Sequence, residues 1–151
     1  MAMRVLLYHD VVREGRWTDS GFPEGHANVY KLTREDFHAH LQSLNAACAA
    51  PALVTDRAES GWMLTFDDGG SSALDTIAPA LEQYGWRGHF FMTTGRLGAP
   101  GFLDGASLRA LAARGHIIGS HSVTHPLVMS ACSPAQLRQE WQASVRTLAD
   151  H

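Results

Sequence analysis

Residues 62–70 read WMLTFDDGG, and this stretch decides the fold. Its first five residues form a short, largely apolar run, which predicts a β-strand over 62–66 that ends at an acidic pair and two glycines. Similar apolar runs occur at 5–8, 90–92 and 117–118, and amphipathic stretches separate them. This alternation predicts an α/β fold of four (β/α) units around a mainly parallel sheet. The run at 5–8 is continuously apolar, so we expect that strand to be covered on both faces.

The amphipathic stretches are predicted to be helices. Thr33 and Ser133 are suited to cap the first and the last of them, and Pro79 should start, kink or split the second. The last helix should bury one face, which carries Leu137, Trp141, Val145 and Leu148. A long loop is predicted over 11–28, and long loops inside compact domains often carry function.

Composition restricts the functions open to this chain. Its 151 residues correspond to about one domain. Twelve Lys and Arg stand against 15 Asp and Glu, so no basic surface is expected to collect nucleic acid. The apolar start of the chain is too short for a signal peptide or a membrane span, which predicts a cytoplasmic protein without membrane association. We expect Cys48 and Cys132 to be small buried residues rather than a disulfide.

Polar side chains follow each predicted strand. In parallel α/β folds, ligands bind beyond the carboxyl ends of the strands, so these side chains should surround one opening. Two carboxylates and two or three imidazoles at one opening are ligands that suit a borderline divalent metal. The residues after the four strands, in chain order, are His9 and Asp10; Asp67 and Asp68; Thr93 and Thr94; His121 and His125.

Each pair has a simpler reading when it is taken alone. One carboxylate of Asp67 and Asp68 could cap the helix that begins near Ser71 while the other is solvated. Two histidines four residues apart, such as His121 and His125, also occur by chance in a chain with nine histidines. Both pairs, however, directly follow predicted strands, and this shared position favours a common site.

Two further residues are candidates for contact with a substrate. His9 follows the first strand and could assist at the site, although a structural role near the loop is an equal alternative. Trp17 lies in the predicted long loop, where an aromatic ring could contact a sugar, although packing at the rim is the more common role.

Together these residues resemble a known family. The segments TFDDG at 65–69 and HSVTHP at 121–126 are similar to the first two motifs of the polysaccharide deacetylases of carbohydrate esterase family 4. The flanking segments YHDV at 8–11, FF at 90–91 and GHIIG at 115–119 are also similar to that family. The resemblance covers nearly the whole of residues 1–151, which we interpret as one deacetylase-like domain that is incomplete at its C-terminus.

The resemblance implies a distorted (β/α) barrel and metal-dependent removal of acetyl groups from N-acetylated sugars. Asp68, His121 and His125 would bind the metal, usually Zn²⁺, with Co²⁺, Ni²⁺ or Mn²⁺ as other candidates. Asp67 would be the general base toward a metal-activated water.

The chain also departs from the family pattern. Family members continue through an Arg motif, a later Asp motif and a Leu-x-His motif that supplies a general acid, whereas this chain stops before all three. Four (β/α) units cannot close a barrel, so an outer strand should have an unpaired edge that a partner, such as a second copy in a homo-oligomer, could cover. Two alternatives therefore stay open: a catalytically weak or inactive metal-binding or assembly module, and a hydrolase of C–N bonds in small amides.

Overall fold

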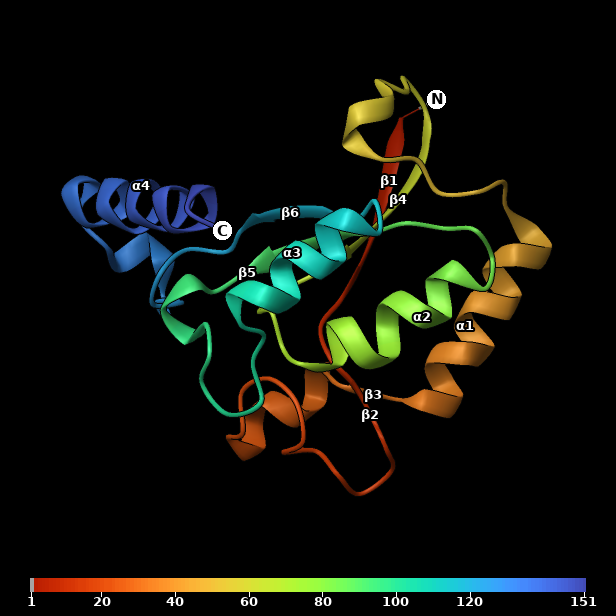
Figure 1. The fold of residues 1–151 in the computed structure, drawn as a ribbon, viewed down its shortest axis with the longest axis horizontal. Coiled ribbons are helices and arrows are strands. Elements are labelled where there is room, and N and C mark those ends of the chain that lie inside the picture. Colours follow the sequence, from red (N-terminus) through yellow and green to blue (C-terminus); the bar gives the residue numbers. More distant parts are fainter. Residues whose placement is uncertain (1) are drawn as a thin grey trace.

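A four-stranded parallel sheet forms the centre of the protein. The computed structural model describes residues 2–151 (Figure 1). The strands are β1 (Met3–Tyr8), β4 (Gly61–Phe66), β5 (His89–Met92) and β6 (Ile117–Ser120), and they lie side by side in this order. Every neighbouring pair is parallel. The predicted α/β class and the four strands are thereby confirmed.

Four helices connect or follow these strands. They are α1 (Arg34–Ala47), α2 (Ala78–Glu82), α3 (Gly105–Ala113) and α4 (Pro134–Ala149). The expected caps are present, since the Thr33 side chain accepts a hydrogen bond from the Asp36 N–H and Ser133 forms a capping box with Gln136. Pro79 lies at the start of α2, and a π-helical turn, Ala73–Ile77, directly precedes this helix. The helical segment is therefore divided near Pro79, as expected for a residue without a backbone N–H.

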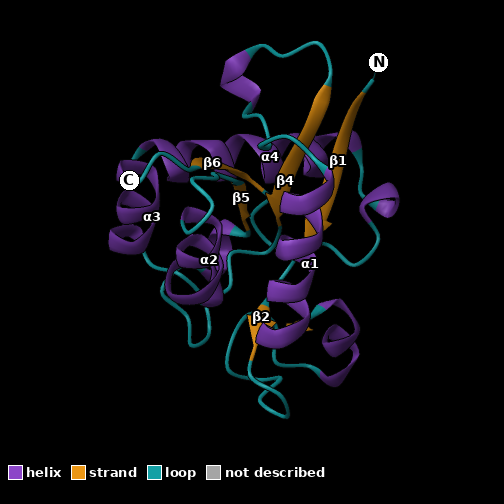
Figure 2. Cartoon of the chain, turned by 90° about the vertical axis from the view of Figure 1, so that its right-hand side faces the viewer, coloured by secondary structure: helices purple, strands orange, loops and turns teal. Residues whose placement is uncertain are grey.

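The predicted loop over 11–28 contains more structure than expected. It begins with β2 (Val11–Val12), which pairs in parallel with β3 (Leu32–Thr33). Between these strands the chain forms a 3₁₀ turn, Gly25–Tyr30. Figure 2 shows β2 beyond the end of β1, on the side to which the parallel strands point. We call residues 13–31 the β2–β3 loop.

The hydrophobic core lies between one face of the sheet and helices α1 to α3. From the sheet come Leu64, Phe66 and Phe90, whose alternate positions face the helices, and the rings of Phe66 and Phe90 stack at 4.9 Å. Helix α1 contributes Phe37 and Leu41, and both are fully buried. Burial of each such side chain stabilises the fold by roughly 1.5–3 kcal/mol.

The expectation that β1 is covered on both faces is wrong. Val5 and Leu7 are 51% and 54% exposed, whereas Leu6 and Tyr8 pack against the core. The physical reason is that β1 lies at the edge of the sheet and helices cover only one of its faces. Among the described strands, β1 and β6 each have one neighbour, which confirms the predicted unpaired edges.

The predicted buried face of α4 is also wrong. Trp141 and Val145 are 43% and 57% exposed, and the fully buried residue of the helix is Ser144. The Ser120 hydroxyl of β6 donates to the Ser144 hydroxyl at 2.7 Å. A small polar residue lets the helix approach β6 closely, so the large apolar side chains of α4 are turned toward solvent. Leu148 still packs against the core, as expected.

The cysteine prediction fails in one respect. Cys48 is exposed and Cys132 is half-buried, so neither is a buried filler. Cys48 is the residue that ends α1, where the chain leaves the core. Both thiols are free, as expected. Within residues 2–151, none of the helices is long and apolar enough to cross a membrane.

Candidate metal centre

The two sequence motifs meet at the carboxyl ends of the parallel strands. Asp67 and Asp68 directly follow β4, and the segment 121–125 follows β6. Backbone hydrogen bonds join the strand ends: the Asp67 N–H donates to the Tyr8 carbonyl at 3.0 Å, and the His121 N–H donates to the Met92 carbonyl at 2.8 Å. Parallel pairing therefore places the acidic pair and the histidines at one end of the sheet.

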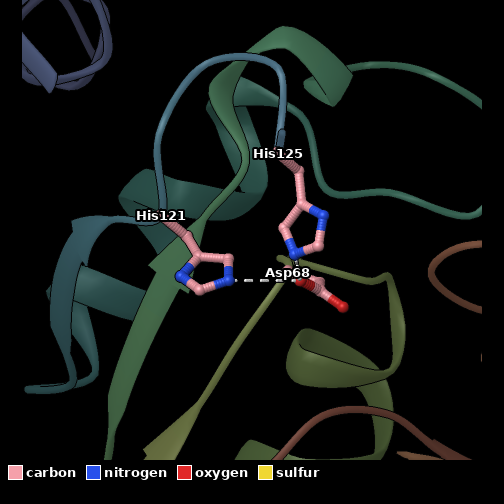
Figure 3. Close-up of side chains that lie close together, drawn as sticks. All are labelled: Asp68, His121 and His125. Carbon is pink, nitrogen blue, oxygen red and sulfur yellow. Dashed lines mark ion pairs between the residues drawn. The ribbon is translucent and has the colours of Figure 1, made fainter. Parts of the chain in front are cut away.

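Asp68, His121 and His125 form a compact cluster (Figure 3). Asp68 Oδ1 lies 3.5 Å from His121 Nε2 and 3.4 Å from His125 Nε2, and the three potential ligand atoms all lie within 4.8 Å of one another. Asp68 is buried, and the two histidines are half-buried. The structure thus brings together the three residues that the sequence analysis selected as metal ligands.

The geometry of this cluster fits a divalent metal. In a tetrahedral site with bonds of about 2.0–2.1 Å, two ligand atoms are about 3.3 Å apart, which is close to the two distances from Asp68 Oδ1. This oxygen is buried and has no hydrogen-bond partner within the described residues. A buried carboxylate oxygen without a hydrogen bond is costly unless a cation neutralises it. Oxygen and imidazole ligands of this kind suit zinc and similar ions.

The backbone at this site is strained. Asp68, Ser122 and His125 have φ angles of 74°, 68° and 55°, in the left-handed region that non-glycine residues rarely adopt. Each such residue costs of order 1–3 kcal/mol and persists only where its surroundings hold it. The φ angle of Gly69 is 81°, so the chain turns immediately after the acidic pair, as the two glycines predict.

Glu140 of α4 holds the histidine segment in place. Its carboxylate accepts hydrogen bonds from the backbone N–H groups of Val123 and Thr124, both at 2.8 Å, and from the Thr124 hydroxyl at 2.7 Å. Burial acts to raise the pKa of Glu140, but these hydrogen bonds outweigh it and hold the pKa below its usual value. Glu140 could not be predicted from the sequence, because no local pattern connects it to a segment 16 or 17 residues away.

Asp67 lies beside the three-residue cluster rather than within it. Its Oδ2 atom is 3.9 Å from His121 Nε2, and its side chain is only 12% exposed. Burial raises the pKa of Asp67, and the nearby imidazoles of His121 and His9 oppose this increase. The carboxylate is therefore close to the cluster without being one of its three converging ligands.

The β2–β3 loop borders the site on two sides. Phe22 packs against His125 with ring centroids 5.1 Å apart, and the Arg96 guanidinium lies over the Phe22 ring, 5.1 Å from its centre. At the other side, Tyr30 packs against His9, also at 5.1 Å. Neither Phe22 nor Tyr30 was singled out from the sequence, since a lone aromatic residue in a loop carries no positional signal.

Lys31 stabilises the β2–β3 loop through hydrogen bonds to its backbone. This residue is the one lysine in the sequence, and it is buried. Its ammonium group donates to the carbonyl oxygens of Trp17, Ser20 and Phe22 at 2.5, 2.8 and 2.7 Å. Burial lowers the pKa of Lys31, whereas the Asp10 carboxylate opposes this shift. Trp17 thus contacts Lys31 through its backbone carbonyl group, and a role of its ring in substrate binding stays a prediction.

Asp10 joins the loop to the turn after β4. Its carboxylate accepts hydrogen bonds from the hydroxyl groups of Ser20 and Ser72 at 2.6 and 2.9 Å. A Cβ atom at Gly70 would lie 1.9 Å from Asp10 Oδ1, so this close approach requires glycine. Asp10, predicted at the opening, therefore connects the loop to the turn after β4 and is not one of the three clustered residues.

The parallel sheet and the Asp-His-His cluster at the carboxyl ends of its strands place this chain among the α/β proteins with a candidate metal centre. Comparison with known proteins narrows this class. The family model described as polysaccharide deacetylase matches residues 55–151, and the chain belongs to this family.

Relatives and solved structures support the same assignment. YxkH of Bacillus subtilis (strain 168) is 26% identical over 146 residues, which are 90% of this chain and 47% of that protein. A gellan lyase of a Bacillus species is 36% identical over 96 residues, which are 64% of this chain and 4% of that protein. This chain therefore spans about half the length of YxkH and a small part of the gellan lyase.

Two solved structures have the same fold. The Streptococcus pyogenes deacetylase PplD in complex with acetate has a TM-score of 0.77 at 17% identity, over 99% of this chain and 70% of that chain. IcaB from Ammonifex degensii has a TM-score of 0.75 at 19% identity, over 99% of this chain and 69% of that chain. At these identities the likeness establishes the (β/α) fold.

Proposed function

We propose that this chain is a metal-dependent hydrolase that removes N-acetyl groups from an N-acetylated poly- or oligosaccharide. The observation that carries the proposal is the convergence of Asp68, His121 and His125, with Asp67 beside them at the same end of the sheet. Membership of the polysaccharide deacetylase family supports the substrate class.

Different residues would bind the metal and transfer the proton. Asp68, His121 and His125 would hold the ion, with Zn²⁺ as the first candidate and Co²⁺, Ni²⁺ or Mn²⁺ as others. Such an ion, when bound, supplies Lewis-acid polarisation and lowers the pKa of water. Asp67 acts as the general base: its carboxylate takes a proton from the attacking water, because it lies within a few ångströms of the cluster.

His9 and Trp17 are the proposed substrate contacts. His9 follows the end of β1, and the Asp67 N–H donates to the carbonyl of the preceding residue, Tyr8. This arrangement puts His9 next to the proposed base. Trp17 belongs to the loop that borders the site and is anchored there by Lys31.

The test is acetate release from N-acetylated chitooligosaccharides by the zinc-loaded chain and by its Asp67→Asn variant. The amide keeps the size of the side chain but cannot accept the proton in the same way. General-base catalysis contributes about 10²- to 10⁴-fold, so we expect acetate release to fall by at least about 100-fold while the zinc content stays unchanged. An Asp67→Asn variant that retains the wild-type rate would refute the assignment of the base.

Simple amides distinguish the second enzymatic candidate. A hydrolase of C–N bonds in small molecules would release the amine from an acetylated small amide as efficiently as from an oligosaccharide. A preference for the oligosaccharide of at least about tenfold in kcat/KM supports the polysaccharide substrate, whereas the reverse preference favours the small amide.

The exposed apolar face of β1 favours one candidate from another class, an assembly module. Val5 and Leu7 lie on an edge strand and are more than half exposed. Edge strands with apolar side chains associate readily with another strand. A non-catalytic assembly module predicts a dimer whose fraction rises with protein concentration, together with bound metal and no acetate release. A monomer at all concentrations in light scattering would exclude self-association through this face.

A further inference from the structure

We infer that Tyr30 and His9 together form an aromatic wall that stacks against a sugar ring of the substrate, next to the residue whose acetyl group is removed. This inference rests on the proposed function, and it names Tyr30 as a residue that gives preference for oligosaccharides over small amides. The group that this wall would accept is a pyranose ring.

The strand pairing places this wall beside Asp67. Strands β1 and β4 are parallel, with Tyr8 opposite Phe66 at their ends. The Asp67 N–H donates to the Tyr8 carbonyl at 3.0 Å, so the chain continues into His9 directly alongside Asp67. His9 is therefore at the β1 edge of the site, whereas His125 follows β6 at the other edge of the sheet.

Tyr30 extends the His9 ring outward into solvent. The two ring centres are 5.1 Å apart and their planes are inclined by 34°, so the two rings pack against each other in a tilted arrangement. Tyr30 nevertheless remains 60% exposed. Among the described residues, Trp141 is the other large aromatic side chain with a comparable exposure, and it belongs to α4, which follows β6 at the opposite edge of the sheet. Tyr30 is thus the exposed aromatic ring that lies next to His9 on the β1 side.

The backbone beneath Tyr30 is fixed before any ligand arrives. The next residue, Lys31, is buried and donates to three carbonyl groups of the same loop. Its N–H donates to the Asn28 carbonyl at 3.1 Å, and the Leu32 N–H donates to the Asp10 carbonyl at 3.0 Å. A preorganised contact surface loses little conformational entropy on binding. Binding to Tyr30 therefore does not require this loop to be ordered first, and the contact can add to the affinity for the substrate.

The chemistry of the wall fits a pyranose ring. One face of a pyranose carries mostly C–H groups, whereas its hydroxyl groups point outward around the ring. An aromatic face covers such a C–H surface, and the tyrosine hydroxyl remains free to bond at the edge of the ring. A small amide with no neighbouring ring gains nothing from this wall, so its contribution appears only with an oligosaccharide.

Calorimetric titration with N-acetylated chitotetraose tests the inference. The comparison uses zinc-loaded Asp67→Asn, which slows turnover by at least about 100-fold under the proposed mechanism, as the common background for Tyr30→Ala, Tyr30→Phe and Val29→Ala. Val29 is the matched control, because it is the neighbouring residue of the same turn and is 79% exposed. We expect Tyr30→Ala to weaken binding by at least about tenfold, and Tyr30→Phe and Val29→Ala to change it by less than about twofold.

The outcomes separate the inference from the function on which it rests. Unchanged affinity in Tyr30→Ala, with zinc content and melting temperature preserved, overturns the inference and leaves the proposed function intact. Equal weakening in Val29→Ala also overturns it, because the effect then belongs to the turn and not to the aromatic ring. The proposed function is judged independently, by acetate release from the unsubstituted chain, so its failure is recognised without the titration.

Discussion

Removal of the Glu140 carboxylate should weaken zinc binding although Glu140 is not itself a ligand. The carboxylate accepts three hydrogen bonds of 2.7–2.8 Å from the segment between the two histidines. A hydrogen bond to a charged group is worth about 1.5–3 kcal/mol. Thr124 is exposed, so water replaces part of what is lost in Glu140→Ala. We therefore expect a net cost of about 2 kcal/mol, equivalent to about a 30-fold weaker affinity for zinc.

Competitive zinc titration against a chromogenic chelator measures this effect. Glu140→Gln keeps one acceptor oxygen without the charge and should lose about fivefold, which is consistent with the weaker bonds of a neutral acceptor. Arg138→Ala is the matched control, since Arg138 is an exposed residue of the same helix. An affinity for zinc that is the same in Glu140→Ala and in Arg138→Ala would refute the reasoning that the Glu140 carboxylate holds the histidine segment in place.

Three further changes probe other parts of the fold. Lys31→Met leaves three backbone carbonyl groups without their hydrogen-bond donor, so the free energy of unfolding in urea should fall by about 2–4 kcal/mol; a loss below about 1 kcal/mol would contradict this role. The hydrogen bonds from Arg114 are the main cause that lowers the pKa of Glu82 to about 2. The ionised carboxylate therefore stabilises the folded state above about pH 4.5, and this contribution is lost as the pH falls toward 2. The difference in unfolding free energy between wild type and Glu82→Gln should therefore shrink over this range, and a constant difference would contradict the assignment. Ser144→Leu should destabilise by about 1–3 kcal/mol through overpacking, whereas Trp141→Gln should change stability by about 0.5 kcal/mol or less in thermal melts; the opposite order would mean that α4 packs as its sequence pattern suggests.

The strands and the Asp-His-His cluster could be predicted because their signals are local. The predicted strands at 62–66 and 90–92 correspond to β4 and β5, whose apolar residues must be buried for the sheet to form. The convergence of Asp68, His121 and His125 could be predicted because the carboxyl ends of parallel strands meet at one edge of the sheet.

Features that depend on distant partners could not be predicted. The sequence pattern of α4 favours burial of Trp141, but the hydroxyl contact between Ser120 and Ser144 sets which face meets β6. The role of Glu140 depends on a segment that only the fold brings near it. Likewise, Tyr30 reaches His9 because β2, which lies in the region predicted as a loop, pairs with β3.

The zinc content of the purified chain tests the metal centre most directly. After loading and dialysis, elemental analysis should find about one zinc per wild-type chain and a loss of most of it in His125→Ala, because removal of one of three converging ligands leaves too few to retain the ion. A wild-type chain without zinc, or a His125→Ala chain that retains a full equivalent, would contradict the assignment of Asp68, His121 and His125 as the ligands.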